Sequence, residues 1–219
     1  MPAVDHPPTE TFLPDRLSLA ALRRSVDGCR GCDLWRDATQ GVIGEGPVRA
    51  SLLMFVGEQP GDQEDLQGRP FVGPAGAILD RGLEEVGIPR GEAFVTNAVK
   101  HFKWTRRGKR RLHQKPTLGE VTACRPWLDA EVEVVRPRMI VPLGATASQA
   151  ILGSSFRVSR QRGEVFTDHE LAPWVMATVH PSSILRARDE DRERAWRDFV
   201  ADLSKVAARY VEERARTAS

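Results

Sequence analysis

Residues 51–57, SLLMFVG, form a short apolar run that ends in glycine. A run of this length without alternating polar residues is typical of a strand buried on both faces of a parallel sheet. A loop rich in glycine and proline follows, and residues 75–86 (AGAILDRGLEEV) have the spacing of a helix. This stretch therefore predicts a strand, a loop and a helix in succession, which is the repeating unit of an α/β fold.

The same order recurs along the rest of the chain. The other predicted elements are strands at 93–99, 138–144 and 174–180, and helices at 16–27, 118–135, 145–153 and 190–214. This alternation favours a three-layer α/β/α sandwich with a central four-stranded, mainly parallel sheet. We expect residues 16–215 to form one domain and the proline-rich residues 1–15 to form a flexible N-terminal arm.

The composition is that of an ordinary globular protein, with 41% hydrophobic and 28% charged residues in 219. No run of about 18 apolar residues is present, so a membrane span is not expected. The N-terminus lacks the basic start and apolar stretch of a secretory signal, which predicts a cytoplasmic protein. No segment resembles a dedicated interface, and we expect a monomer.

The charge is concentrated in one segment. Eight of the 32 basic residues lie between positions 100 and 115, where there is no acid, and the other 24 face 30 acids in the rest of the chain. A mildly acidic body with one basic segment favours a local contact with a polyanion over a generally basic surface. A solvated loop is the alternative.

The three cysteines, Cys29, Cys32 and Cys124, are an odd number, which does not favour a disulfide framework. The Cys-x-x-Cys spacing suits two ligands of one metal or cluster, and His101 is the candidate for a fourth ligand beside Cys124. Zinc and a four-iron cluster both fit such a set. A loop cysteine pair with one buried helical cysteine explains the residues equally well.

Polar residues follow three of the predicted strands. Glu58-Gln59-Pro60-Gly61 follows the first, Asn97 lies near the end of the second, and His180-Pro181-Ser182 follows the fourth. Ligand sites of open parallel sheets form beyond the carboxyl ends of the strands. The sequence therefore predicts a site at this edge of the sheet.

Several of these segments resemble, in order, the motifs of the family 4 uracil-DNA glycosylases. The matching segments are GEQPG at 57–61, GRPFVGPAG at 68–76, TNAVK at 96–100, CRPWL at 124–128 and HPSS at 180–183. Enzymes of this family hold a four-iron, four-sulfur cluster with four cysteines. The resemblance implies a cluster here on Cys29, Cys32, His101 and Cys124, with histidine in place of one cysteine and with zinc as the alternative metal.

The resemblance also implies roles in the chemistry of base excision. Asn97 would hydrogen-bond the edge of uracil, and Phe71 would stack on its ring. His180 would donate to a uracil carbonyl oxygen, and the Glu58 carboxylate would stabilise the cationic sugar or orient a nucleophile. Ser182 would cap the helix that follows or hold a phosphate. Further substrate contacts are expected from Gln59, Asp62 and Arg111.

The segment GKRRLH at 108–113 is longer than the family 4 pattern. It resembles the X-type uracil-DNA glycosylases, whose loop histidine bonds covalently to the sugar after uracil leaves. We therefore expect His113 to capture uracil-containing DNA, with a single strand as the expected substrate. Two alternatives remain: a hydrolytic glycosylase in which water reaches the sugar, and a metal-stabilised nucleic-acid-binding protein without activity.

Overall fold

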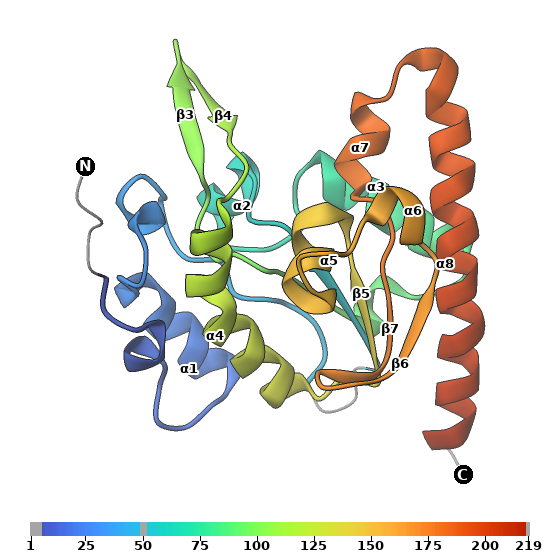
Figure 1. Ribbon diagram of the computed structural model, residues 1–219, viewed down its shortest axis with the longest axis horizontal. Helices are drawn as coiled ribbons and strands as arrows, with labels where there is room; N and C mark the ends of the chain where they lie inside the picture. Colours follow the sequence, from blue (N-terminus) through green and yellow to red (C-terminus); the bar gives the residue numbers. More distant parts are fainter. Residues whose placement is uncertain (1–5, 49–51, 218–219) are drawn as a thin grey trace.

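The computed structural model describes residues 6–48 and 52–217, and within them five strands form the main sheet. In spatial order the strands are β2 (Ala93–Asn97), β1 (Leu53–Gly57), β5 (Met139–Pro142), β7 (Ala172–Met176) and β6 (Val165–His169). The first four are parallel, and β6 pairs with β7 in the antiparallel direction. The predicted α/β fold is confirmed, with one edge strand more than the four expected (Figure 1).

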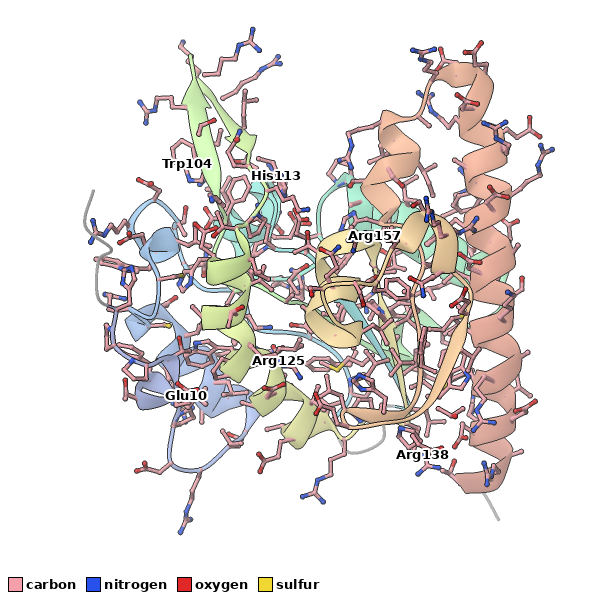
Figure 2. The ribbon with its side chains drawn as sticks, viewed as in Figure 1. Glu10, Trp104, His113, Arg125, Arg138 and Arg157 are labelled. Atoms are coloured by element: carbon pink, nitrogen blue, oxygen red, sulfur yellow. The ribbon has the colours of Figure 1, made fainter. Side chains whose placement is uncertain are left out.

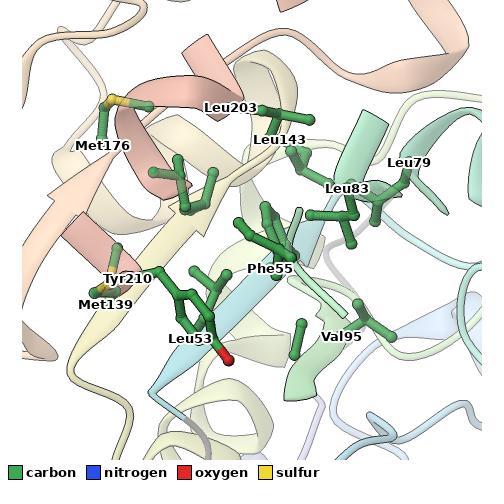
Figure 3. Packing of buried hydrophobic residues seen from close by; sticks show 14 of the residues in the cluster. Leu53, Phe55, Leu79, Leu83, Val95, Met139, Leu143, Met176, Leu203 and Tyr210 are labelled. Atoms are coloured by element: carbon green, nitrogen blue, oxygen red, sulfur yellow. The ribbon is translucent and has the colours of Figure 1, made fainter. Parts of the chain in front are cut away.

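Helices cover both faces of this sheet. One face packs against α3 (Pro74–Glu85), α7 (Pro181–Arg186) and α8 (Asp189–Thr217), and the other packs against α4 (Leu118–Val135) and α5 (Gly144–Leu152). Alternate residues of β1 pack against the two helical layers. Leu53 and Phe55 lie in the core on the side of α3 and α8, and Met54 and Val56 lie in the core on the side of α4 and α5. Figure 3 shows the first of these cores, where Leu79, Leu83 and Leu203 from the helices surround Phe55.

A third apolar cluster lies on the outer side of α4. It joins that helix to the N-terminal elements, which are η1 (Thr9–Phe12), α1 (Leu19–Ser25), η2 (Val26–Gly28) and η3 (Asp33–Arg36). Thr9 is buried, and Phe12 and Leu13 pack on this cluster. Residues 9–13 thus pack against the body of the protein, and the extent of the flexible arm stays a prediction. Residues 1–5 lie outside the described residues.

Several elements arise where the sequence predicts only loops. They are α2 (Asp62–Gln67), η4 (Arg90–Glu92), the hairpin of β3 (Trp104–Arg107) and β4 (Arg110–His113), α6 (Val158–Gln161) and β6. These segments are short and polar, so they lack the apolar periodicity on which sequence-based assignment depends. Within the described residues, no helix is both long and hydrophobic enough to traverse a bilayer.

The connectivity places a crevice at one edge of the sheet. The chain passes from β1 to β2 on one side, then crosses back to β5 on the other side of β1. Parallel sheets bind ligands where the strand order reverses in this way, beyond the carboxyl ends of the strands. The loops after β1 and β5 diverge at this point.

Candidate active site

A cavity of about 580 Å³ opens at the carboxyl ends of the parallel strands. The predicted residues that line it include Glu58, Phe71, Asn97, His113 and His180. The structure thus brings together side chains that are up to 122 positions apart in the chain. Gln59, Asp62 and Ser182 also line the cavity, whereas Arg111 is not among the lining residues.

Asn97 forms the floor of the cavity at the end of β2. It is only 3% exposed, and its side-chain amide has no hydrogen-bond partner among the residues that the structure describes. A Cβ at Gly57 would lie 2.3 Å from Oδ1 of Asn97 and 2.8 Å from Cζ of Phe71, so the glycine permits this approach. Buried amides are nearly always paired, and an unpaired one that faces a cavity is available to a ligand.

Phe71 is held in a conformation that few side chains adopt. Its φ of 57° lies in the left-handed region, and its ring stacks on that of His180 with centroids 6.1 Å apart. A Cβ at Gly76 would lie 1.8 Å from the Phe71 carbonyl oxygen, so the start of α3 closes tightly on this residue. Glu64 accepts the Gly73 N–H at 2.9 Å and fixes the other end of the turn. These contacts therefore hold the Phe71 ring in one orientation at the cavity wall.

His180 is a neutral hydrogen-bond donor. Its Nδ1 accepts the backbone N–H of Ser182 at 3.2 Å, so the proton of the neutral ring resides on Nε2. Burial lowers the pKa of His180 to about 4 and keeps the ring uncharged at neutral pH. The His180 ring itself caps α7, while the Ser182 hydroxyl lies 2.8 Å from Nδ1 and accepts from Arg186.

Glu58 has a partner at each carboxylate oxygen. Oε1 lies 3.3 Å from Nε2 of His113, and Oε2 accepts the hydroxyl of Thr146 on the first turn of α5. Burial raises the pKa of Glu58, but the hydrogen bonds with His113 and Thr146 outweigh it, so the net pKa lies below the usual range. Thr146 was not predicted from the sequence, although it follows β5 just as Glu58 follows β1.

The hairpin that carries His113 is anchored by residues of the first motif. The Gln59 amide donates to the carbonyls of Lys103 and Gln114 at 3.2 and 3.0 Å and accepts the Lys103 N–H at 3.1 Å. Lys103 and Gln114 flank the two strands of the hairpin. Figure 2 shows His113 at the base of the hairpin, on the side that faces α5.

Arg111 provides a second anchor. Its guanidinium pairs with Asp62 at 2.5 Å and with Asp65, which is completely buried, at 2.6 Å. The polar groups of Gln59, Asp62 and Arg111 are thus engaged within the protein, and their substrate contacts stay predictions. The tip of the hairpin differs: in the described part of the chain its cations have no hydrogen-bond or ion-pair partner, and these are Arg106, Arg107, Lys109 and Arg110.

The cysteines gather in the third apolar cluster. Cys29 and Cys124 are buried there, with Cys32 packed against them. Sγ of Cys29 accepts the Trp127 indole N–H at 3.3 Å, and Sγ of Cys124 accepts the Lys100 backbone N–H at 3.2 Å. Within residues 6–48 and 52–217, no three His, Cys, Asp or Glu side chains are grouped to hold a single metal ion.

The chemistry of these side chains fits a metal centre. Burial raises the pKa of Cys124 to about 12, so this thiol ionises at neutral pH only with a cation bound to it. His101 is 5% exposed and has no hydrogen bond in the described residues, and burial lowers its pKa to about 4. Its ring is therefore neutral, as a ligand must be. N–H donors directed at sulfur are typical of cluster sites.

The chain is similar in sequence to known enzymes. The chain is 37% identical over 175 residues to a type-4 uracil-DNA glycosylase of Sulfurisphaera tokodaii, covering 77% of this chain and 76% of the relative. It is 39% identical over 170 residues to the type-4 enzyme of Thermotoga maritima, covering 77% and 84%, and 36% identical over 191 residues to that of Archaeoglobus fulgidus, covering 83% and 90%. Residues 43–204 match the family described as the uracil DNA glycosylase superfamily. The chain belongs to the uracil-DNA glycosylase superfamily.

Proposed function

We propose that this protein excises uracil from DNA and is then captured on the resulting abasic sugar by His113. The observation that carries the proposal is the pairing of His113 with Glu58 across 3.3 Å, in the cavity that also holds Asn97 and His180. Histidine can act as a covalent nucleophile, and an adjacent general base such as a carboxylate activates a nucleophile. The proposed substrate is uracil in single-stranded DNA, because a base in a single strand can enter the cavity without the cost of breaking a base pair. The proposed acting form is a monomer.

Excision depends on the residues at the strand ends. The unpaired amide of Asn97 suits the donor–acceptor pattern of the uracil edge, and Phe71 offers a face on which the base stacks. As the C1′–N1 bond breaks, its electron pair leaves with uracil, and the sugar becomes cationic. Nε2–H of neutral His180 stabilises the departing anion, and ionised Glu58 stabilises the sugar cation.

Capture follows on the cationic sugar. The Nε2 proton of His113 passes to Glu58, and the Nε2 electron pair forms a bond to C1′. The uracil anion takes a proton from water, and the Glu58 proton returns to solvent. A glycosyl imidazole is uncharged and leaves poorly, so the adduct persists and one molecule of protein is consumed for each uracil.

The hydrolytic alternative uses the same cavity. In it Glu58 activates a water that attacks C1′, and His113 only fills space or contacts phosphate. A denaturing gel of the protein with a single-stranded oligonucleotide that contains one uracil separates the two reactions. Covalent capture gives a band that resists boiling, and hydrolysis gives abasic DNA that breaks in alkali without a shifted band. A protein that only binds DNA gives neither product.

His113→Ser tests the nucleophile directly. We expect it to abolish the shifted band and to admit water, so that alkali-labile DNA accumulates instead. The matched control is His169→Ser, because His169 lies on β6, away from the cavity lining. A shifted band of normal intensity from His113→Ser would refute the assignment, and so would loss of the band from His169→Ser with an unchanged Tm.

We further propose that Cys29, Cys32, His101 and Cys124 hold a four-iron, four-sulfur cluster, with zinc as the alternative. A bound cluster would cross-link the N-terminal elements to α4 and add its binding free energy to folding. The cluster predicts a brown protein with broad visible absorption and equal iron and sulfide content. Cys124→Ala should lose the colour, whereas His101→Cys should keep it with an altered spectrum. A colourless, zinc-loaded protein from anaerobic preparation would contradict the cluster.

A further inference from the structure

Thr146 contacts the proposed machinery without belonging to any motif recognised in the sequence. Its hydroxyl donates to Oε2 of Glu58, while the other carboxylate oxygen faces His113. Thr146 is 5% exposed and lines the cavity from the first turn of α5. The contact spans the crevice between the loops that follow β1 and β5, which are 88 positions apart in the chain.

The two donors to Glu58 differ in what happens to them during the proposed reaction. His113 loses its Nε2 proton and moves onto the sugar, so its bond to the carboxylate breaks. Thr146 lies on a helix that packs on the sheet through Ala147 and Ile151, and it takes no part in bond making. Thr146 is therefore the partner that can hold the carboxylate throughout.

The orientation of the carboxylate is also set by this contact. A glutamate side chain has a broad, nearly two-fold preference at its last torsion, so one oxygen must be held for the other to have a fixed direction. With Oε2 held by Thr146, Oε1 points at His113. A hydrogen bond to the ionised form also favours ionisation of a buried carboxyl.

We propose that Thr146 is a positioning residue that keeps the Glu58 carboxylate ionised and directs its Oε1 to His113 and the sugar. The inference rests on the proposed function for its catalytic meaning. Its structural content, a hydroxyl that controls the ionisation of Glu58, does not depend on activity and is measured separately.

The test compares Thr146→Val, which removes the donor at similar volume, with Thr146→Ser, which keeps it. The pKa of Glu58 in the free protein is read from carboxyl ¹³C NMR, with the resonance assigned by Glu58→Gln. We expect Thr146→Val to raise this pKa and Thr146→Ser to leave it near the wild-type value. Ser148→Ala is the matched control, because this buried hydroxyl on the same helix bonds to the Gly144 carbonyl and to no other group in the described residues.

Single-turnover kinetics give the catalytic readout. Thr146→Val should slow excision at neutral pH by about 10- to 100-fold, while affinity for the DNA changes by less than about twofold. The acidic limb of its pH–rate profile should move to higher pH, because the carboxylate that works in the reaction now forms only at higher pH. Thr146→Ser should restore both the rate and the profile.

Two results would overturn the inference: a wild-type Glu58 pKa in Thr146→Val, or a slow rate with an unmoved pH profile. If the valine variant does not fold, Thr146→Ala provides the same comparison with less bulk. If the wild-type protein excises no uracil and yet Thr146→Val raises the Glu58 pKa, the proposed function fails while the role of Thr146 stands.

Discussion

The floor of the cavity and the hairpin beside it are built in different ways. Asn97 ends β2 and Glu58 directly follows β1, and both strands are buried. The strand β1 pairs with parallel strands on both sides, and the edge strand β2 pairs with β1 on one side and is bridged from Val95 to Glu45 on the other. The hairpin that carries His113 is a two-stranded ribbon joined to the body by side chains, chiefly Gln59 and Arg111. An isolated two-stranded hairpin is marginally stable in water, so these anchors must fix it. Base recognition therefore depends on the sheet, and capture depends on a few long-range contacts.

The largest effect should come from the strand-end side. His180→Ala removes a preorganised donor to the departing base, and we expect excision to slow by about 100- to 1000-fold. Capture should slow in parallel, because the cationic sugar that His113 attacks forms more slowly. Single-turnover rates of uracil release and adduct formation measure both steps. Loss of the adduct with normal uracil release would contradict the separation of the two regions.

Arg111→Met should weaken the anchoring of the hairpin without changing the strand-end residues of the cavity. Removing the guanidinium leaves buried Asp65 without its ion-pair partner and with only the Thr39 N–H as a donor among the described residues, which costs about 3–5 kcal/mol of local stability. We expect adduct formation to slow by about 10- to 100-fold, with uracil release less affected. The yield of adduct per uracil released is the measurement.

Arg106→Met is the control for this variant. Arg106 lies opposite Arg111 in the hairpin register but is exposed and has no ion-pair partner among the described residues. Its substitution should leave the adduct yield per uracil unchanged. An equal loss in both variants would show that charge, rather than anchoring, explains the result.

The tip of the hairpin should act on affinity instead. The double variant Arg107→Ala, Arg110→Ala removes two exposed cations that lie opposite each other in the register of the hairpin. If both contact phosphates, the association constant for single-stranded DNA should depend less steeply on salt. The slope of its logarithm against the logarithm of the salt concentration should fall in magnitude by about 1.4. Arg16→Ala, Arg24→Ala removes the same charge from an exposed surface outside the cavity lining and should leave the slope unchanged.

The smallest expected effect concerns pH and stability. The folded-state pKa of His180 is lowered to about 4, so between that value and about 6.5 the unfolded chain binds a proton that the folded chain does not. Stability should therefore decrease as the pH falls through this window, by about 1.4 kcal/mol per pH unit for one proton. Denaturant titrations of the wild type and His180→Asn should show a shallower slope in the variant.

Elements defined by local patterns were well predicted from the sequence. The helix expected at 118–135 has those bounds, because Thr117 and Glu120 form a capping box at its start and Arg136 adopts a left-handed conformation after its end. The strands β1 and β5 were predicted because each is a short, continuous apolar run. The hairpin was missed, since the four residues of β3 are exposed or half-buried and have no apolar alternation.

The candidate site was predicted in its residues but not in its contacts. Glu58, Asn97 and His180 could be placed at one edge because each follows a parallel strand. The pairing of His113 with Glu58 depends on a hairpin turning back over the sheet, and no local pattern reports it. Arg111 likewise was expected at the substrate, and its two carboxylate partners lie 46 and 49 positions away.

The sequence by itself determined the α/β fold, the order of its main elements and the residue types at the strand ends, because apolar runs and capping patterns act over a few residues. Only the tertiary structure decided which side chains meet: Thr146 with Glu58, Gln59 with the ends of the hairpin, and residues 9–13 with the outer side of α4. Such contacts join distant segments, and their geometry exists only once the sheet and its two helical layers have closed around the core.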